Sequence, residues 1–150
     1  MGPKSPSWQG HIWGKVLSGI LALAILGALG LLFYFIATPR EKGVTEFYLL
    51  GLSGEAGEYP AQLAVGQEGK VVVGIVNREY RIMTYRLEIT ISGKLNQEIG
   101  PMILGPDEKW ENMVVFTPKR AGDKQKVEFL LYRPGQSEVY RSLYLWLDVR

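Results

Sequence analysis

Residues 16–37 form one uninterrupted stretch without a charged side chain, and its only polar side chains are Ser18 and Tyr34. At about 1.5 Å per residue, a helix over this stretch reaches roughly 33 Å. The hydrocarbon core of a bilayer is about 30 Å thick. The sequence therefore predicts a single transmembrane helix over residues 16–37, preceded by a short tail over residues 1–15.

Aromatic side chains flank this stretch on both sides, and such rings favour the headgroup level of a membrane. They are Trp8 and Trp13 before the stretch and Phe33, Tyr34 and Phe35 at its end. We expect these five residues to lie at the two membrane interfaces. Pro39 is expected to end the helix, because proline has no backbone N–H to donate.

The apolar stretch is longer than the core of about 7–15 residues in a secretory signal, and its end offers no small-x-small cleavage site. An uncleaved anchor is expected, with a cleaved signal and a buried core helix as the alternatives. Lysines and arginines flank both ends and only slightly favour a cytoplasmic N-terminus. By analogy with other membrane-tethered sandwiches, the C-terminal part is expected outside the cytoplasm, at the plasma membrane.

Beyond a connector at residues 38–44, the chain is patterned as strands separated by turns. In residues 83–92, apolar and polar side chains alternate, which is typical of a strand with one buried face. The other predicted strands are residues 46–50, 70–76, 109–116, 125–132 and 139–149, with a weaker one within 95–104 that Gly100 and Pro101 interrupt. About seven short strands predict an all-β, antiparallel sandwich over residues 45–150.

Charge and composition exclude several classes of function. The predicted β-domain carries 13 basic and 14 acidic residues, so nothing favours nucleic acid as a partner. The chain has no cysteine, and its one histidine, His11, precedes the apolar stretch. A cysteine nucleophile, a Ser-His-Asp triad and a histidine metal site in the β-domain are thereby excluded. We expect no catalytic, cofactor or metal site, and no enzyme.

Two of the predicted strands are apolar on both faces, which a two-layer sandwich does not require. Either loops and neighbouring side chains shade the second face, or that face is an aromatic contact surface. The candidate contact residues are Phe47, Tyr48, Tyr140, Tyr144 and Trp146. If Arg141 faces inward, it needs an acidic partner such as Glu46 or Glu128, because an unpaired buried charge is costly.

The strand motifs resemble a family of uncharacterised prokaryotic membrane proteins, largely archaeal and in part bacterial, that share a domain of unknown function. The matching stretches are residues 45–51, 59–60, 65–66 with Gly69, 73–77, 84–85, Trp110, 116–118, 128–132 and 140–149. The resemblance implies an immunoglobulin-like sandwich held at the cell surface. Many relatives have several helices before the domain, so functions located in those helices do not transfer to this chain.

These observations favour a non-enzymatic, single-pass membrane protein whose sandwich serves as an interaction or assembly module, with the lipid bilayer as its first partner. The alternatives are a carbohydrate-binding module for surface glycan or envelope polymer, and an enzyme. The connector over residues 38–44 reaches only roughly 25 Å when extended. Other membrane proteins of a larger complex are therefore the expected partners.

Overall fold

The computed structural model describes residue 2, residues 9–38 and residues 43–150. The chain divides into two compact units, Met1–Glu41 and Lys42–Arg150. Within the described residues it forms one helix and eight strands. Trp8, expected at a membrane interface, and Pro39, expected to end the helix, lie outside the described residues.

The helix α1 spans Gln9–Ala37, so it contains the whole predicted transmembrane stretch and begins seven residues before it. The helix starts earlier because residues 9–15 contain no proline and continue the helical hydrogen bonding. Residues Gly10–Ala37 are long and apolar enough to cross a membrane. Trp13 and Tyr34 stand 21 residues apart on this helix, which corresponds to roughly 32 Å, close to the thickness of a bilayer core.

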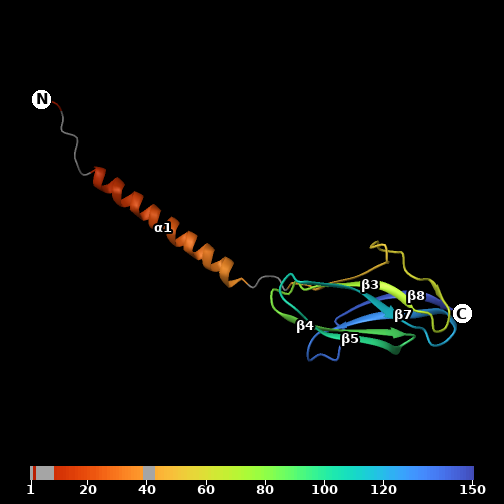
Figure 1. The fold of residues 1–150 in the computed structure, drawn as a ribbon. Coiled ribbons are helices and arrows are strands. Elements are labelled where there is room, and N and C mark those ends of the chain that lie inside the picture. Colours follow the sequence, from red (N-terminus) through yellow and green to blue (C-terminus); the bar gives the residue numbers. More distant parts are fainter. Residues whose placement is uncertain (1, 3–8, 39–42) are drawn as a thin grey trace. The chain divides into compact units, whose positions relative to one another are not determined.

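Residues 46–149 form a sandwich of two sheets that lie face to face (Figure 1). The three-stranded sheet has the order β1-β3-β6, with strands Glu46–Leu50, Gly69–Val76 and Lys109–Phe116. The five-stranded sheet has the order β2-β8-β7-β4-β5. Its strands are Gln62–Leu63, Arg141–Val149, Gly122–Tyr132, Met83–Ile91 and Lys94–Leu104. The all-β sandwich predicted from the sequence is therefore confirmed.

The structure differs most from the sequence-based prediction in two strands, while β7 begins three residues earlier and β8 two residues later than predicted. β2 is an eighth strand of only two residues, and it pairs parallel to β8 at Asp148 and Val149, whereas every other ladder is antiparallel in the described part of the chain. β5 is not interrupted at Gly100 and Pro101. Its ladder with β4 shifts register between Tyr85 and Leu87, and this bulge accommodates both residues within the strand.

The core lies between the two sheets and is filled by one face of each strand. β3 contributes Val71, Val73 and Ile75, and the β4 alternation is confirmed by Leu87 and Ile89, all of which are fully buried. Phe116 and Phe129 meet edge to face across the two sheets, with ring centroids 6.2 Å apart. Packing between the sheets therefore stabilises this domain chiefly through apolar burial.

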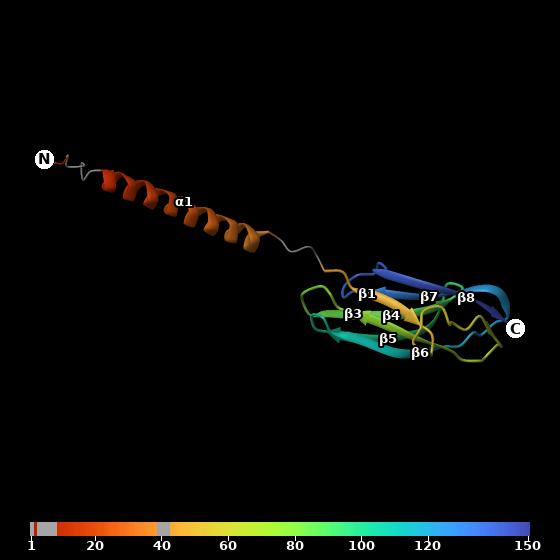
Figure 2. The ribbon, with the colours of Figure 1, turned by 90° about the horizontal axis from the view of Figure 1, so that it is seen from above.

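The end of the sandwich where β1 begins is called here the proximal end. It consists of residues 43–45 and three loops, at residues 77–82, 105–108 and 133–140. In Figure 2, β1 runs from this end towards the end that carries the C-terminus. Gly43 packs so closely against Arg78 that a Cβ atom at position 43 would overlap the Arg78 carbonyl oxygen. The chain thus joins the domain directly beside the 77–82 loop.

A buried polar network holds the proximal end together. Asn77 is fully buried, and its Nδ2 donates to the carbonyl oxygens of Arg81, Leu104 and Gly105 at 2.7, 2.8 and 3.0 Å. Its Oδ1 accepts the backbone N–H of Glu79 at 2.9 Å and the hydroxyl of Tyr85 at 3.3 Å. One side chain therefore fixes the 77–82 loop to β4 and to the loop after β5.

Glu79 extends this network to the other two segments of the proximal end. Its Oε1 accepts the hydroxyls of Thr45 at 3.2 Å and Tyr140 at 2.6 Å, and Arg133 Nη1 lies 3.5 Å away. Thr45 is also hydrogen-bonded to Tyr85 over 2.7 Å. Burial raises the pKa of the Tyr85 phenol, so Tyr85 stays neutral in this network.

Candidate interaction surface

Tyr144 and Trp146 form an aromatic pair on the outer face of the five-stranded sheet. They alternate on β8 with the core residues Leu145 and Leu147, as the sequence predicts, and are 59% and 56% exposed. Their ring centroids lie 5.9 Å apart with the planes 72° from parallel. Both rings are held against each other in an edge-to-face arrangement, yet both remain open to a partner.

Charged side chains of β7 flank this pair. Lys126 lies opposite Trp146 and Glu128 lies opposite Tyr144 in the antiparallel ladder. Lys126 Nζ is 2.6 Å from Glu128 Oε1 and 4.9 Å from the centre of the Tyr144 ring. The lysine ammonium thus contacts both a carboxylate and an aromatic face, which fixes its position beside the pair. The aromatic pair, Lys126 and Glu128 are together called the β8 patch.

The β8 patch lies beside an open strand edge. Among the described residues, β8 pairs on one side with β7 along its length, and on the other side only with the two residues of β2. The backbone N–H of Asp148 and of Arg150 on this second side is bonded to Ala61 and Leu63. Residues 141–147 carry no such strand, although residues 44–47 lie beside residues 141–143. The edge of residues 144–147 therefore offers backbone donors and acceptors next to exposed aromatic rings.

Tyr48 lies on the other sheet, on the outer face of β1. Its ring covers Gly74 of β3, and its hydroxyl donates to Glu111 Oε2 on β6. This hydrogen bond, together with burial, raises the pKa of Tyr48 to about 12, and it lowers the pKa of the Glu111 carboxyl. The outer face of β3 is therefore shaded by a neighbouring side chain. This is one of the two interpretations that the sequence allowed for a strand that is apolar on both faces.

The remaining candidate contact residues occupy two further places. Phe47 packs against the core from β1. Tyr140 is half-buried at the proximal end, where its hydroxyl donates to Glu79 and Arg133 lies 3.9 Å from its ring centre. The structure thus brings Tyr144 and Trp146 together, and it separates them from Phe47, Tyr48 and Tyr140.

Arg141 does not need the buried acidic partner that an inward orientation would require. Its side chain is exposed, and its guanidinium lies 5.5 Å from the Tyr140 ring centre. The two suggested partners bind elsewhere, since Glu46 pairs with Arg78 and Glu128 with Lys126.

Four of the five residues predicted to lie at the membrane interfaces belong to the described part of α1. Trp13 and the group of Phe33, Tyr34 and Phe35 are exposed near the two ends of the helix. The sequence reasoning did not identify Lys126, the network around Asn77, or the exposed loop residues Tyr80 and Ile82. Only the loop offered a signal in the sequence, because two large apolar residues stand there between predicted strands.

Comparison with known proteins confirms the fold. A family model described as "Domain of unknown function (DUF1616)" matches residues 38–148. The CARDB domain of the PF1109 protein from Pyrococcus furiosus, solved as a crystal structure with di-metal ions and in solution, matches with 14% identity and a TM-score of 0.53. The match covers 73% of this chain and 90% and 97% of those chains. It supports the immunoglobulin-like sandwich that the sequence resemblance implied.

Further comparisons concern the structural similarity to an enzyme and the similarity to curated sequences. A β-glucosidase from Listeria innocua matches with 11% identity and a TM-score of 0.50, over 71% of this chain and 16% of the enzyme. A comparison with curated protein sequences finds no match. In the described part of this chain, no group of three or more His, Asp or Glu side chains could hold a metal ion.

Proposed function

We propose that this chain, which belongs to the DUF1616 family over residues 38–148, is a single-pass membrane protein with a non-enzymatic interaction module. Its sandwich binds another membrane protein, and the chain acts as an accessory subunit of a membrane or cell-surface complex. The proposed orientation places the N-terminus in the cytoplasm and the sandwich outside the plasma membrane.

The β8 patch is the observation that carries this proposal. Exposed tyrosine and tryptophan side chains are frequent anchors of protein interfaces, where a few of them supply most of the binding energy. Here two such side chains stand beside an open strand edge that can accept backbone hydrogen bonds. The helix α1 supports a membrane-bound partner, because it is long and apolar enough to hold the chain in a bilayer.

The geometry of the pair favours a protein over a glycan as the ligand. A sugar ring stacks on the flat face of an aromatic side chain, and two coplanar rings make a platform for an extended glycan. The Tyr144 and Trp146 planes differ by 72°, so they cannot form one flat platform. Edge-to-face rings with a lysine and a glutamate alongside match the mixed apolar and polar chemistry of a protein interface.

Photo-crosslinking in intact cells tests the proposal. A photoreactive phenylalanine analogue replaces Tyr144 or, as the control, Met113, an exposed apolar residue on the outer face of the other sheet. We expect a membrane protein to be crosslinked from position 144 and not from position 113. The same protein should co-purify with the full chain in mild detergent, and Trp146→Ala should abolish its retention while Met113→Ala preserves it.

Three outcomes would contradict this proposal. Equal crosslinking from positions 144 and 113 would show that the β8 patch has no specific partner. Unchanged retention by folded Trp146→Ala would remove the patch from the interface. Binding of the detergent-solubilised full chain to a glycan array, abolished by the same substitution, would establish the alternative of a carbohydrate-binding module.

A further inference from the structure

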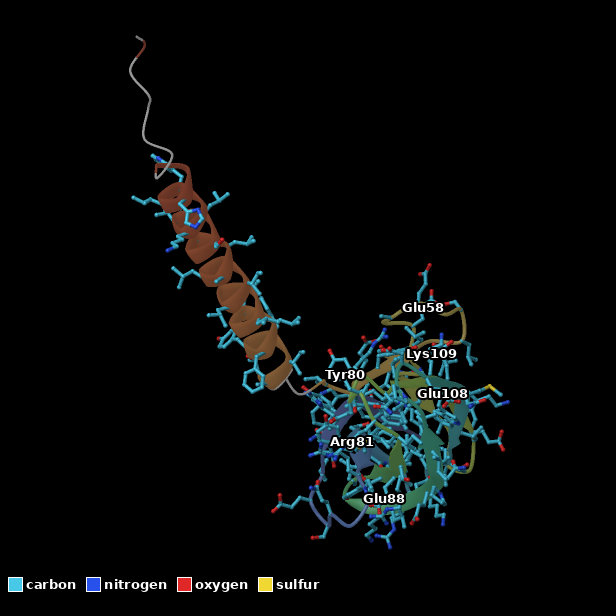
Figure 3. The ribbon with its side chains drawn as sticks, turned by 90° about the vertical axis from the view of Figure 1, so that its left-hand side faces the viewer. Glu58, Tyr80, Arg81, Glu88, Glu108 and Lys109 are labelled. Carbon is cyan, nitrogen blue, oxygen red and sulfur yellow. The ribbon has the colours of Figure 1, made fainter. Side chains whose placement is uncertain are left out.

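The 77–82 loop presents two large apolar side chains and a cation to solvent at the proximal end. Tyr80 is 63% and Ile82 is 69% exposed, and the Arg81 side chain between them is exposed as well. Val44 and Val139, on the neighbouring segments of the same end, are also exposed. Figure 3 looks onto this end and labels Tyr80 and Arg81 on the loop.

The loop is held in a defined conformation rather than left free. Asn77 accepts the Glu79 N–H and donates to the Arg81 carbonyl, so the base of the loop is fixed on both sides of Tyr80. Tyr80 has a φ of 57°, a left-handed conformation that a bulky residue seldom adopts. A buried hydrogen-bond network thus stabilises an unfavourable backbone that keeps three consecutive side chains exposed.

With α1 in a bilayer, the connector limits how far this end of the domain can lie from the membrane surface. Gly43 already packs against the loop at Arg78, and six residue steps separate it from Ala37 at the end of α1. Those steps reach at most roughly 22 Å. The nine residues of β4 or of β8 span roughly 30 Å, so the opposite end of the sandwich can lie that much farther from α1. The tether therefore gives the proximal loops the highest effective concentration at the membrane.

On this basis, which rests on the proposed membrane span of α1, we propose that Tyr80, Arg81 and Ile82 insert into the headgroup region of the bilayer. Tyrosine suits this depth because its ring is apolar and its hydroxyl can stay hydrated. Isoleucine gains from leaving water, and the arginine guanidinium can bind lipid phosphate. The contact would set the orientation of the sandwich on the membrane and hence the direction in which the β8 patch faces.

Apolar insertion, rather than net charge, supplies this contact. Arg78, three residues before Arg81, is neutralised by Glu46 at 3.0 Å and Asp107 at 2.8 Å. Glu108 and Glu138 are exposed acidic residues of the same end, and they oppose attraction to anionic lipid. Arg81 should therefore add only a modest preference for anionic over zwitterionic lipid.

Depth-dependent quenching of a fluorescent label tests the contact in the full chain. Because the chain has no cysteine, single cysteines can be placed by Ile82→Cys and by the control Leu52→Cys, whose parent side chain is 63% exposed in the loop after β1. A third variant, Leu23→Cys, reports on α1. Each labelled chain is reconstituted into phosphatidylcholine vesicles containing lipids brominated near the carbonyl or near the chain end, with and without phosphatidylglycerol.

We expect lipids brominated near the carbonyl to quench the label at position 82 and not the label at position 52. Lipids brominated near the chain end should quench position 23. Quenching at 23 without quenching at 82 would overturn this inference and leave the membrane span intact. Absence of quenching at 23 would overturn the span, and the inference with it.

Two further results bear on the same inference. Equal quenching at 82 and 52 would show that the domain contacts lipid without preference for the proximal end, which contradicts the proposal. Tyr80→Ser in the chain labelled at position 82 should reduce its quenching, and unchanged quenching in this variant would remove Tyr80 from the contact. Arg81→Gln should abolish any gain from added phosphatidylglycerol.

Discussion

At the scale of single residues, Asn77 connects more of the domain than any apolar side chain of its size could. Its side-chain amide forms hydrogen bonds with three carbonyls, one N–H and one hydroxyl, which come from three separate segments. An aliphatic side chain would fill the same space and leave these groups without partners. Buried polar groups without partners are costly, so the identity of this residue matters more than its volume.

Asn77→Ala should therefore lower the free energy of unfolding by about 3 kcal/mol, since several buried carbonyls lose their donor. The matched control is Asn112→Ala, at an exposed position of β6, with an expected change within about 0.5 kcal/mol. Denaturant unfolding of the full chain in detergent, followed by tryptophan fluorescence, measures both. Similar losses for the two variants would contradict the role assigned to Asn77.

Tyr48 gives a residue-scale prediction for alkaline pH. Its pKa rises from 10.0 to about 12 because the phenol donates to the Glu111 carboxylate and is partly desolvated. A folded-state pKa above the unfolded one means that the Tyr48 contribution to stability is present below pH 10 and is lost as the pH rises towards about 12. Below pH 10, Tyr48→Phe should thus be less stable than the parent chain.

Carbon-13 NMR of the labelled tyrosine ring measures this titration directly. Glu111→Gln removes the negative charge that disfavours the phenolate and should move the Tyr48 pKa back towards 10.0. An unchanged midpoint in Glu111→Gln would show that burial, and not the Glu111 hydrogen bond, raises the pKa.

At the scale of elements, the strands were predictable where one face alternates and turn residues mark both ends. β1 and β6 have the predicted bounds, and the apolar and aromatic faces of β8 are those expected from the alternation. β2 could not be predicted, because two residues carry no periodicity and their pairing depends on where β8 lies. The early start of α1 could not be predicted from the apolar stretch, because residues 9–15 are helical without being uniformly apolar.

The candidate site was predictable only where it depends on one strand. Tyr144 and Trp146 are two residues apart on β8, and a strand places such side chains on the same face. Tyr48 and Tyr140 belong to other segments, and their surroundings depend on Gly74, Glu111 and Glu79, which only the folded chain brings near. Aromatic residues in a sequence thus predict contacts within a strand better than contacts between segments that are distant in the sequence.

The junction between the connector and β1 depends on the absence of a side chain at Gly43. An added Cβ would overlap the Arg78 carbonyl, and backbone atoms cannot move aside as a side chain can. Gly43→Ala should therefore destabilise the domain by about 2 kcal/mol and separate residues 43–45 from the 77–82 loop. Hydrogen exchange of the Glu79 amide, together with denaturant unfolding, detects both effects.

Gly105→Ala is the matched control for this substitution. It lies at the same proximal end, and a Cβ there would meet only Glu108 Oε2, at 3.4 Å. We expect little change in stability and no faster exchange at Glu79. If both alanine variants behave alike, the close packing of Gly43 on Arg78 does not hold the junction together.

At the scale of the whole molecule, the two units require different environments. α1 needs an apolar environment along its length, while the sandwich has a complete core of its own and a charged surface. A membrane anchor joined to a water-exposed domain satisfies both. The side of the membrane on which the sandwich lies then depends on the charges that flank α1.

Those charges are nearly balanced, so the proposed orientation needs a direct test. Lys4 and Lys15 precede the apolar stretch, and Arg40 and Lys42 follow it. In intact cells, a membrane-impermeant maleimide should label Ser137→Cys, in the exposed 133–140 loop, and should label Gly2→Cys only after permeabilisation. The opposite pattern would place the sandwich in the cytoplasm.

The near balance also predicts that orientation is easily changed. Removing the two lysine charges by Lys4→Gln and Lys15→Gln leaves Arg40 and Lys42 as the only lysine or arginine residues that flank the apolar stretch, so the excess of positive charge moves to the C-terminal side. Because positively charged flanks are retained in the cytoplasm, part of the population should then insert with position 137 protected from the maleimide. Unchanged labelling would mean that the folding sandwich, rather than the flanking charge, decides the orientation of the chain.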